Sequence, residues 1–364
     1  MDETVPAVGR LPAIPLPSSD GVNLSDQARA QLTSPINTKL IPAIYILVFV
    51  IGLPANAMAL WIMAAKSKKP STIFLINLAT TDLLLILMLP FKISYHLLGN
   101  DWRFGEGLCR TMTAFFYGNM YCSILLLTFI SIDRYFALVH PFISRRFRDN
   151  TFAVVACIVI WVIVILFVLP FLFVKQCFEI PDLGITSCHD VYLKDNEIVQ
   201  FHYWLAVVVL GFFIPSFITI FCYISVIKCL MVNETKYRKA VKITILILFM
   251  YLVCFTPSNT VLLVHQWVPE LHTCYMSFLS LSSFNSCIDP FIYYYISDEF
   301  RNKVKMVLCF QKVGTRELNL QPSTMLELTS PMISSPSSSS TLCREYLSHS
   351  DNEAPRMDPK SVLN

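Results

Sequence analysis

The amino-acid sequence predicts an all-α integral membrane protein, a seven-transmembrane helix bundle with a short amphipathic eighth helix. Among 364 residues, 55% are hydrophobic and 15% are charged, and the mean hydropathy is +0.57. A soluble domain has about 25% charged residues. Seven stretches reach the roughly 20 apolar residues that span a bilayer. They are residues 40–64, 71–94, 108–139, 151–174, 201–229, 240–265 and 273–296.

Basic residues gather in alternate connections between these stretches, and the opposite connections are poorer in them. Cytoplasmic loops carry the excess of Lys and Arg, which predicts an outer N-terminus and an inner C-terminus. The net charge of +3 gives no reason to expect a nucleic-acid partner. The basic residues are Lys66, Lys68, Lys69, Arg145, Arg146, Arg148, Lys228, Lys236, Arg238, Lys239, Lys242, Arg301, Lys303 and Lys305.

Two polar tails flank the predicted bundle of residues 40–297. Residues 1–39 form an outer tail that reads as disordered, and Asn23-Leu24-Ser25 in it is a glycosylation sequon. The tail has no apolar h-region. Either the first span serves as a signal anchor or the true start precedes this sequence, and we favour the second. Residues 311–364 are Ser-rich and read as a disordered, phosphorylatable inner tail.

Residues 298–310 predict an amphipathic helix on the inner membrane surface. Phe300, Val304 and Leu308 fall on one face, and Arg301 and Lys305 fall on another. Cys309 follows as a palmitoylation candidate, with a free thiol as the alternative.

Prolines interrupt six of the seven spans, where they kink helices and free backbone carbonyls that neighbours must satisfy. They are Pro54, Pro90, Pro170, Pro215, Pro257 and Pro290. The third span instead ends in Asp133-Arg134-Tyr135. An acid and a guanidinium are costly in hydrocarbon, so this pair marks the water boundary or a switch.

Cysteines on the outer side form a second group of interest. Cys109 and Cys188 both face the oxidising side, so a disulfide between them is allowed. A second bridge between Cys177 and Cys274 stays open, because spacing alone does not fix connectivity.

Two carboxylates lie within the predicted membrane interior, Asp82 in the second span and Asp289 in the seventh. Facing carboxylates repel, so one must hold a proton or both must share a cation. Asn285 lies four residues before Asp289 and on the same helix face. A small cation pocket and a satisfied polar network are both open interpretations.

Seven ordered motifs over residues 40–310 resemble those of the rhodopsin-like (class A) G-protein-coupled receptors. The motifs are Gly52-Leu53-Pro54-Ala55-Asn56, Asn77-Leu78-Ala79 with Asp82, Asp133-Arg134-Tyr135, Trp161, Pro215 with Tyr223, Cys254-Phe255-Thr256-Pro257 and Asp289-Pro290-Phe291-Ile292-Tyr293. The resemblance implies heterotrimeric G proteins, arrestin and membrane lipids as partners. It also implies residence in the plasma membrane.

The same resemblance implies roles for individual residues. Asp133 would hold Arg134 in the inactive state, and Tyr223 and Tyr293 would swing toward Arg134 on activation. Phe142 would insert into the G protein. Phe255 stands where many members have a tryptophan toggle. The implied G-protein coupling set is Asp133, Arg134, Tyr135, Phe142, Tyr223 and Tyr293.

A sodium site is the one ion site that the resemblance implies, with Na⁺ as an allosteric ion and no cofactor or other metal. Its residues would be Asp82, Ser123, Asn285 and Asp289.

The outer half resembles a narrower group, the protease-activated (thrombin) receptors, through Ile185-Thr186-Ser187-Cys188-His189-Asp190-Val191. Leu40 to Tyr45 and Ile296 to Val304 look most like type 4, and parts of the third span look closer to type 3. The resemblance implies that a protease cuts the outer tail and that the new N-terminus folds back as a tethered agonist. The implied ligand pocket is Tyr117, His189, Asp190, His265 and Tyr275.

Arg10 is the best cleavage candidate in the tail, and cutting after it would expose Leu11. Tethering gives such a peptide an effective concentration of the order of mM. Val8-Gly9-Arg10 lacks the Pro that thrombin favours, so a trypsin-like serine protease suits it equally. Arg29 is an alternative that leaves a short reach, and an uncut, solvated Arg10 is the other alternative.

Other functional classes lack their signatures here. A membrane enzyme would need a constellation such as His-Glu-x-x-His or Gly-x-Ser-x-Gly, and a transporter would show paired repeats. The sequence has none of these. The realistic alternative is a receptor of the same fold for a diffusible peptide or lipid.

Overall fold

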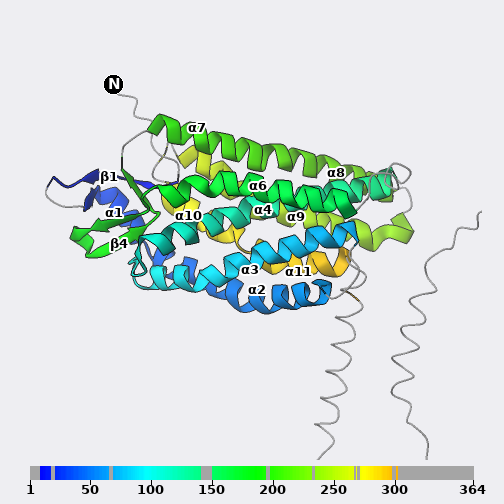
Figure 1. The fold of residues 1–364 in the computed structure, drawn as a ribbon, viewed down its shortest axis with the longest axis horizontal. Coiled ribbons are helices and arrows are strands. Elements are labelled where there is room, and N and C mark those ends of the chain that lie inside the picture. The colour runs from blue at the N-terminus through cyan, green and yellow to red at the C-terminus, as the bar shows by residue number, and fades with distance from the viewer. Residues whose placement is uncertain are drawn as a thin grey trace, which may run out of the picture. The chain divides into compact units, whose positions relative to one another are not determined.

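The computed structural model describes residues 9–17, 21–64, 69–140, 150–193, 197–231, 234–265, 268, 271–296 and 301. Long helices form a bundle, and short strands gather at one end of it (Figure 1). The predicted helix over 298–310, the inner tail, Phe142 and Cys309 fall outside the described residues, Arg301 excepted.

Six helices in the described part of the chain are long and apolar enough to cross a membrane, judged by length and composition. They start and end within several residues of the predicted spans. The segments are α2 (Ile41–Ala64), α3 (Pro70–Leu97), α4 (Gly105–Val139), α6 (Asn150–Phe173), α7 (Glu197–Val208) running through η3 (Val209–Phe213) into α8 (Ile214–Met231), and α9 (Glu234–His265).

The seventh predicted span is present as two shorter helices, α10 (His272–Ser282) and α11 (Asn285–Ile296). The helix is interrupted between them, where Ser282 donates to Leu279 O at 2.7 Å and Ser283 donates to Ser280 O at 2.6 Å. Such backward bonds from hydroxyls compete with regular helix bonds and favour a bend. Asn56 of α2 donates to Ser286 O at 2.7 Å and so fastens the start of α11 to the bundle. The seven-helix fold is therefore confirmed, with a broken last segment.

The π-helical η3 marks a close approach inside the bundle. Five of the six prolines lie in the interior of helices, whereas Pro215 is the second residue of α8, just after η3. A Cβ added to Gly211 would lie 2.8 Å from Tyr121 Cδ1. Glycine therefore lets this part of the helix pack against α4.

The outer tail differs from the disordered tail that composition predicts. Residues 9–17 and 21–40 contain β1 (Leu11–Pro15), β2 (Val22–Leu24), α1 (Asp26–Leu32) and the π-helical η1 (Ile36–Leu40). β1 pairs antiparallel with β2 and parallel with β5 (Val191–Leu193). Alternate residues point to one face and form a buried apolar cluster with Phe178 and Ile180. The tail residues of this cluster are Leu11, Ala13, Val22, Leu24, Ala28 and Leu32.

The loop after α6 folds as a hairpin of β3 (Cys177–Ile180) and β4 (Ile185–Cys188), joined through η2 (Pro181–Leu183). A Cys109–Cys188 disulfide ties this hairpin to α4, as predicted. Cys177 and Cys274 are both free thiols, so the second bridge left open by the sequence is not formed. Cys177 lies beside the Cys109–Cys188 disulfide instead, with its sulfur within 4.8 Å of the two disulfide sulfurs.

Candidate functional site: an outer pocket and an inner polar network

The predicted pocket residues meet at one end of the bundle, next to β4 and β5. The Tyr117 and Tyr275 hydroxyls lie 2.8 Å apart, and His189 Nε2 lies 3.1 Å from the Tyr117 hydroxyl. The rings of His265 and Tyr275 are 6.0 Å apart. α4, α9, α10 and the loop that contains β4 and β5 therefore each contribute to one site.

His189 holds the floor of this pocket in place. Its Nδ1 lies 2.8 Å from Gln176 Oε1, which can only accept, so Nδ1 donates and Nε2 accepts from Tyr117. Burial lowers the pKa of His189 well below its usual range, and the charge of Arg10 adds to this. The ring is therefore neutral at physiological pH. The backbone of His189 has a φ of 73°, which turns the chain sharply before Asp190.

Asp190 is the acidic group of the pocket and is 3% exposed. Its Oδ2 accepts a hydrogen bond from the Tyr95 hydroxyl at 2.5 Å. Lys92 lies over the Tyr95 ring, with Nζ 5.4 Å from the ring centroid. The carboxylate of Asp190 acts electrostatically on Lys92. Tyr95 and Lys92 were not among the pocket residues predicted from the sequence. A lysine within an otherwise apolar span was a usable signal for the second of them.

The chain's own outer tail enters this pocket. Gly9 N donates to His265 Nδ1 at 3.3 Å, and Leu11 N donates to Asp190 O at 2.7 Å. Arg10 lies between these two anchors and is 4% exposed. The alternative of a solvated Arg10 therefore does not hold in this structure, because the neighbouring residues insert it among the side chains of the bundle.

A polar network lies deeper in the bundle around Asp82, which is fully buried. Asp82 accepts hydrogen bonds from Ser286 at 2.8 Å and from Asn119 at 3.1 Å. Tyr293 also donates to Asp82, at 3.2 Å. Asn285 donates to Asp289 at 2.7 Å, which joins the two predicted neighbours. Asn119 and Ser286 were not predicted from the sequence as partners of Asp82.

Two oxygens near the predicted ion site stand out from this network. Ser123 Oγ and Asp289 Oδ1 are buried and have no hydrogen-bond partner among the described residues. Buried polar atoms are normally paired, so each such atom needs an explanation. A hard cation with oxygen ligands fits this donor set.

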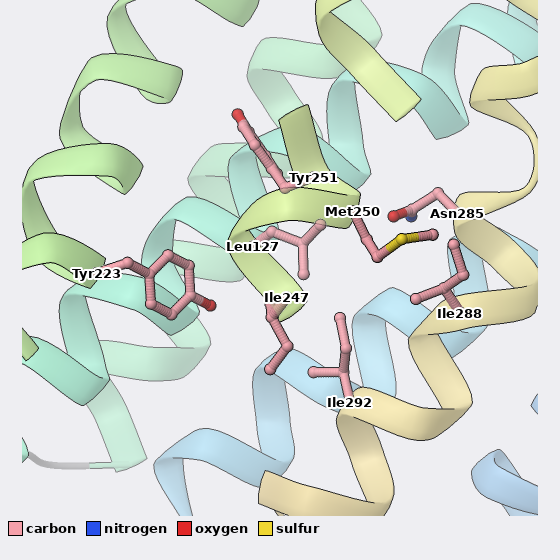
Figure 2. A pocket seen from close by; sticks show the side chains of 8 residues that line it. All are labelled: Leu127, Tyr223, Ile247, Met250, Tyr251, Asn285, Ile288 and Ile292. Atoms are coloured by element: carbon pink, nitrogen blue, oxygen red, sulfur yellow. The ribbon is translucent and has the colours of Figure 1, made fainter. Parts of the chain in front are cut away.

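A small apolar cavity lies next to this network (Figure 2). Asn285 reaches it from α11, and the Tyr223 ring reaches it from the opposite side on α8. Tyr251 lines the cavity as well, and its hydroxyl lies 3.0 Å from Ser216 Oγ. The remaining lining side chains are Leu127, Ile247, Met250, Ile288 and Ile292.

The predicted coupling residues that the structure describes lie on α4, α8 and α11. Asp133 accepts a hydrogen bond from Ser71 at 3.0 Å, and the Tyr135 hydroxyl lies 3.0 Å from His140 Nε2. Arg134 acts electrostatically on the buried Tyr223. Tyr293 is instead engaged in the Asp82 network.

Comparison with known proteins gives consistent relatives. Residues 55–293 match the family "7 transmembrane receptor (rhodopsin family)". The chain is 43% identical to proteinase-activated receptor 3 of Homo sapiens over 292 residues, which cover 78% of each chain. It is 40% identical to proteinase-activated receptor 2 of Rattus norvegicus over 356 residues, 92% of this chain and 89% of the relative. It is 42% identical to proteinase-activated receptor 4 of Rattus norvegicus over 302 residues, 81% of this chain and 76% of the relative.

Proposed function

Since the chain belongs to the rhodopsin family of seven-transmembrane receptors, and within it to the proteinase-activated receptors, we propose a mechanism built on its outer pocket. It is a multi-pass membrane receptor and not an enzyme. An extracellular protease activates it by cutting the outer tail, the new N-terminus acts as a tethered agonist, and heterotrimeric G proteins receive the signal.

The cut is proposed after Arg10, within the tail that the pocket already contacts. The observation that carries this proposal is the bond from Leu11 N to Asp190 O at 2.7 Å. Hydrolysis of the Arg10–Leu11 bond would turn that amide nitrogen into an ammonium group. The ammonium of Leu11 would then lie next to Asp190, whose carboxylate is buried in the pocket. A charge-assisted hydrogen bond between an ammonium and a carboxylate is strong.

The strand β1, which begins at Leu11 and would contain the tethered agonist, supports the same proposal. It pairs with β5 in register, Leu11 opposite Val191 and Ala13 opposite Leu193. β5 directly follows Asp190, so the agonist segment is held beside the pocket before any cut occurs. Such pre-organisation lowers the ordering cost of agonist binding. Arg29 is less suitable, since it lies in α1 and forms an ion pair with Asp182 at 3.0 Å.

The experiment is a calcium measurement in cells that express the chain, before and after a low dose of trypsin-like protease. The Arg10→Ala variant is the test and the Arg29→Ala variant is the matched control. We expect a protease-dependent signal in the parent and in the Arg29→Ala form, and none in the Arg10→Ala form. An equal signal from Arg10→Ala would contradict the proposed cut. Silence from all forms, with surface expression and coupling verified, would favour a diffusible peptide or lipid ligand.

A sodium ion is proposed as an allosteric ligand of the inner network. The unpartnered Ser123 Oγ and Asp289 Oδ1 support it, together with the buried Asp82 and Asn285. These four residues would hold the ion. The inactive bundle would hold the carboxyl groups of Asp82 and Asp289 close together. A cation between them would stabilise this arrangement, because it relieves the repulsion of the two charges.

The remaining assignments follow the family and are likewise proposals. Arg134 and Tyr223 would face the G protein or arrestin with Tyr135, Tyr293 and Phe142, and membrane lipids would surround the bundle. We place the receptor in the plasma membrane with its N-terminus outside. Asn23 is exposed on β2, which suits a glycosylation acceptor. Cys309 remains the proposed palmitoylation site.

A further inference from the structure

Gly9 and Arg10, which we call the plug, fill the outer pocket while the chain is still uncut. The backbone of Gly9 has a φ of +80° and donates to His265. A Cβ at this position would lie 2.9 Å from Leu262 Cδ1 and 3.1 Å from Tyr275 Cε1. Both the conformation and the space therefore admit glycine and oppose any larger residue.

The pocket receives the Arg10 side chain as a buried cation. The carboxylate of Asp190 is the charged group that acts on it, with Tyr117, Tyr203 and Tyr275 nearby. Arg10 Nε is buried and has no hydrogen-bond partner among the described residues. Tyrosine rings and a carboxylate are the usual surroundings of a bound guanidinium. Burial lowers the pKa of Arg10, but a guanidinium keeps its charge at physiological pH. The plug is thus held by the backbone bonds of Gly9 and Leu11, and the carboxylate of Asp190 offsets the charge of Arg10.

We propose that this pocket is a binding site for a peptide that ends in a C-terminal arginine, and that the segment ending at Arg10 is its first occupant. The inference rests on the proposed cut after Arg10. Hydrolysis consumes one water, leaves a carboxylate on Arg10 and places an ammonium on Leu11. Lys92 and Gly9 line the same small cavity, so the new carboxylate would form in a pocket that holds a buried lysine.

The plug opposes activation at two stages. Before the cut it hides the scissile bond, because Arg10 is 4% exposed and Leu11 is 1% exposed. The protease can act only on the undocked fraction of receptors, so the rate of cleavage follows that fraction. After the cut, the released segment competes with the agonist for the pocket until it dissociates.

The first test compares the rate of cleavage in two full-length glycine variants. Gly9→Ala should undock the plug, whereas Gly107→Ala is the control because its Cβ would meet no atom within 4 Å. An N-terminal tag followed on gels reports the cut in intact cells, and free peptides of residues 1–20 with and without Gly9→Ala correct for protease preference. We expect Gly9→Ala to be cut severalfold faster. Equal corrected rates for the two variants would overturn the plug.

The second test uses a fluorescent peptide of residues 1–10 and membranes that carry the full-length Gly9→Ala receptor, whose own plug is weakened. We expect saturable binding, reduced at least tenfold when the peptide carries Arg10→Ala. Equal binding of both peptides, or no binding of either, would overturn the proposed site. If the protease cuts elsewhere, the proposed cut fails while this measurement still decides whether the pocket binds a C-terminal arginine.

Discussion

Asp190 carries the charge that an agonist would need at its amino end. The carboxylate is buried and anchored by Tyr95. The sequence motif around Cys188 predicts this residue and His189 as pocket residues, and the structure places them beside Tyr95 and Tyr117. Their anchors were beyond reach, because Tyr95 lies on α3 and Gln176 precedes β3, and neither contact leaves a periodic pattern in the sequence.

Replacement of Asp190 by Asn should weaken activation by a free peptide of residues 11–16. The amide keeps the shape but loses the charge that would pair with the ammonium of Leu11. A charge-assisted bond contributes about 1.5–3 kcal/mol, so we expect the half-maximal agonist concentration to rise at least tenfold. The measurement is a calcium dose-response curve. Glu179→Gln is the control, since Glu179 is an exposed acid of the same hairpin, and an equal shift from it would contradict the pairing.

Cys177 should be an unreactive thiol despite its place beside a disulfide. Burial raises the pKa of Cys177 to about 12, and the neighbouring Glu106 adds to the effect. The thiolate fraction at neutral pH is then about a thousandfold below that of a thiol at its usual value of 9.0. Alkylation should be slow at pH 7.4 and should accelerate as the pH rises. Glu106→Gln should speed it, and rapid alkylation of the parent protein would contradict this environment.

At the scale of elements, spans were easier to predict than the outer tail. Long apolar runs must be helical in a bilayer, so length and hydropathy located α2 to α9. β1 and β2 are short, and Pro12 and Pro15 give β1 the composition of a disordered segment. Pairing with β5, which lies far along the chain, gives these residues their structure. The break between α10 and α11 was not predicted either. The serines at the break fit a continuous apolar span, and the sequence does not show that their hydroxyls bond to backbone carbonyls of the preceding turn.

Gly211→Ala should destabilise the bundle by overpacking at η3. The added methyl would lie 2.8 Å from Tyr121 Cδ1 and 3.1 Å from Phe167 Cε2. Overpacking costs about 1–3 kcal/mol, which should appear as a lower midpoint of thermal unfolding in detergent. Gly118→Ala on α4 is the matched control, since its Cβ would lie 3.7 Å from the nearest atom. Equal midpoints for the two variants would show that η3 relaxes without cost.

At the scale of the whole molecule, the inner network links four helices, three of them through one carboxylate. Asp82 of α3 contacts Asn119 of α4 and both Ser286 and Tyr293 of α11, while Asn56 of α2 contacts Ser286. The sequence predicted that Asp82 and Asp289 belong together. It did not predict which neutral side chains satisfy Asp82, because several polar residues of α4 and α11 were equally placed by helical spacing.

Replacing external Na⁺ by choline should raise the potency of the free agonist peptide severalfold. A ligand that binds one state better shifts the equilibrium toward that state, so removing an ion that favours the inactive bundle favours activation. Asp82→Asn should abolish the difference between the two salts. Asp26→Asn, in the outer helix α1, is the control and should keep it. A sodium effect that survives in Asp82→Asn would place the ion elsewhere.

The strand β1 stays attached to the receptor through β2 and α1, and this has a consequence for what a cell can measure. A peptide bond that has been hydrolysed does not re-form, so each receptor responds once. The number of activated receptors therefore records the accumulated work of the protease and not its momentary concentration. A brief burst of strong proteolysis and a long period of weak proteolysis would leave the same number of cut receptors. Only newly synthesised receptors would restore an uncut population at the cell surface.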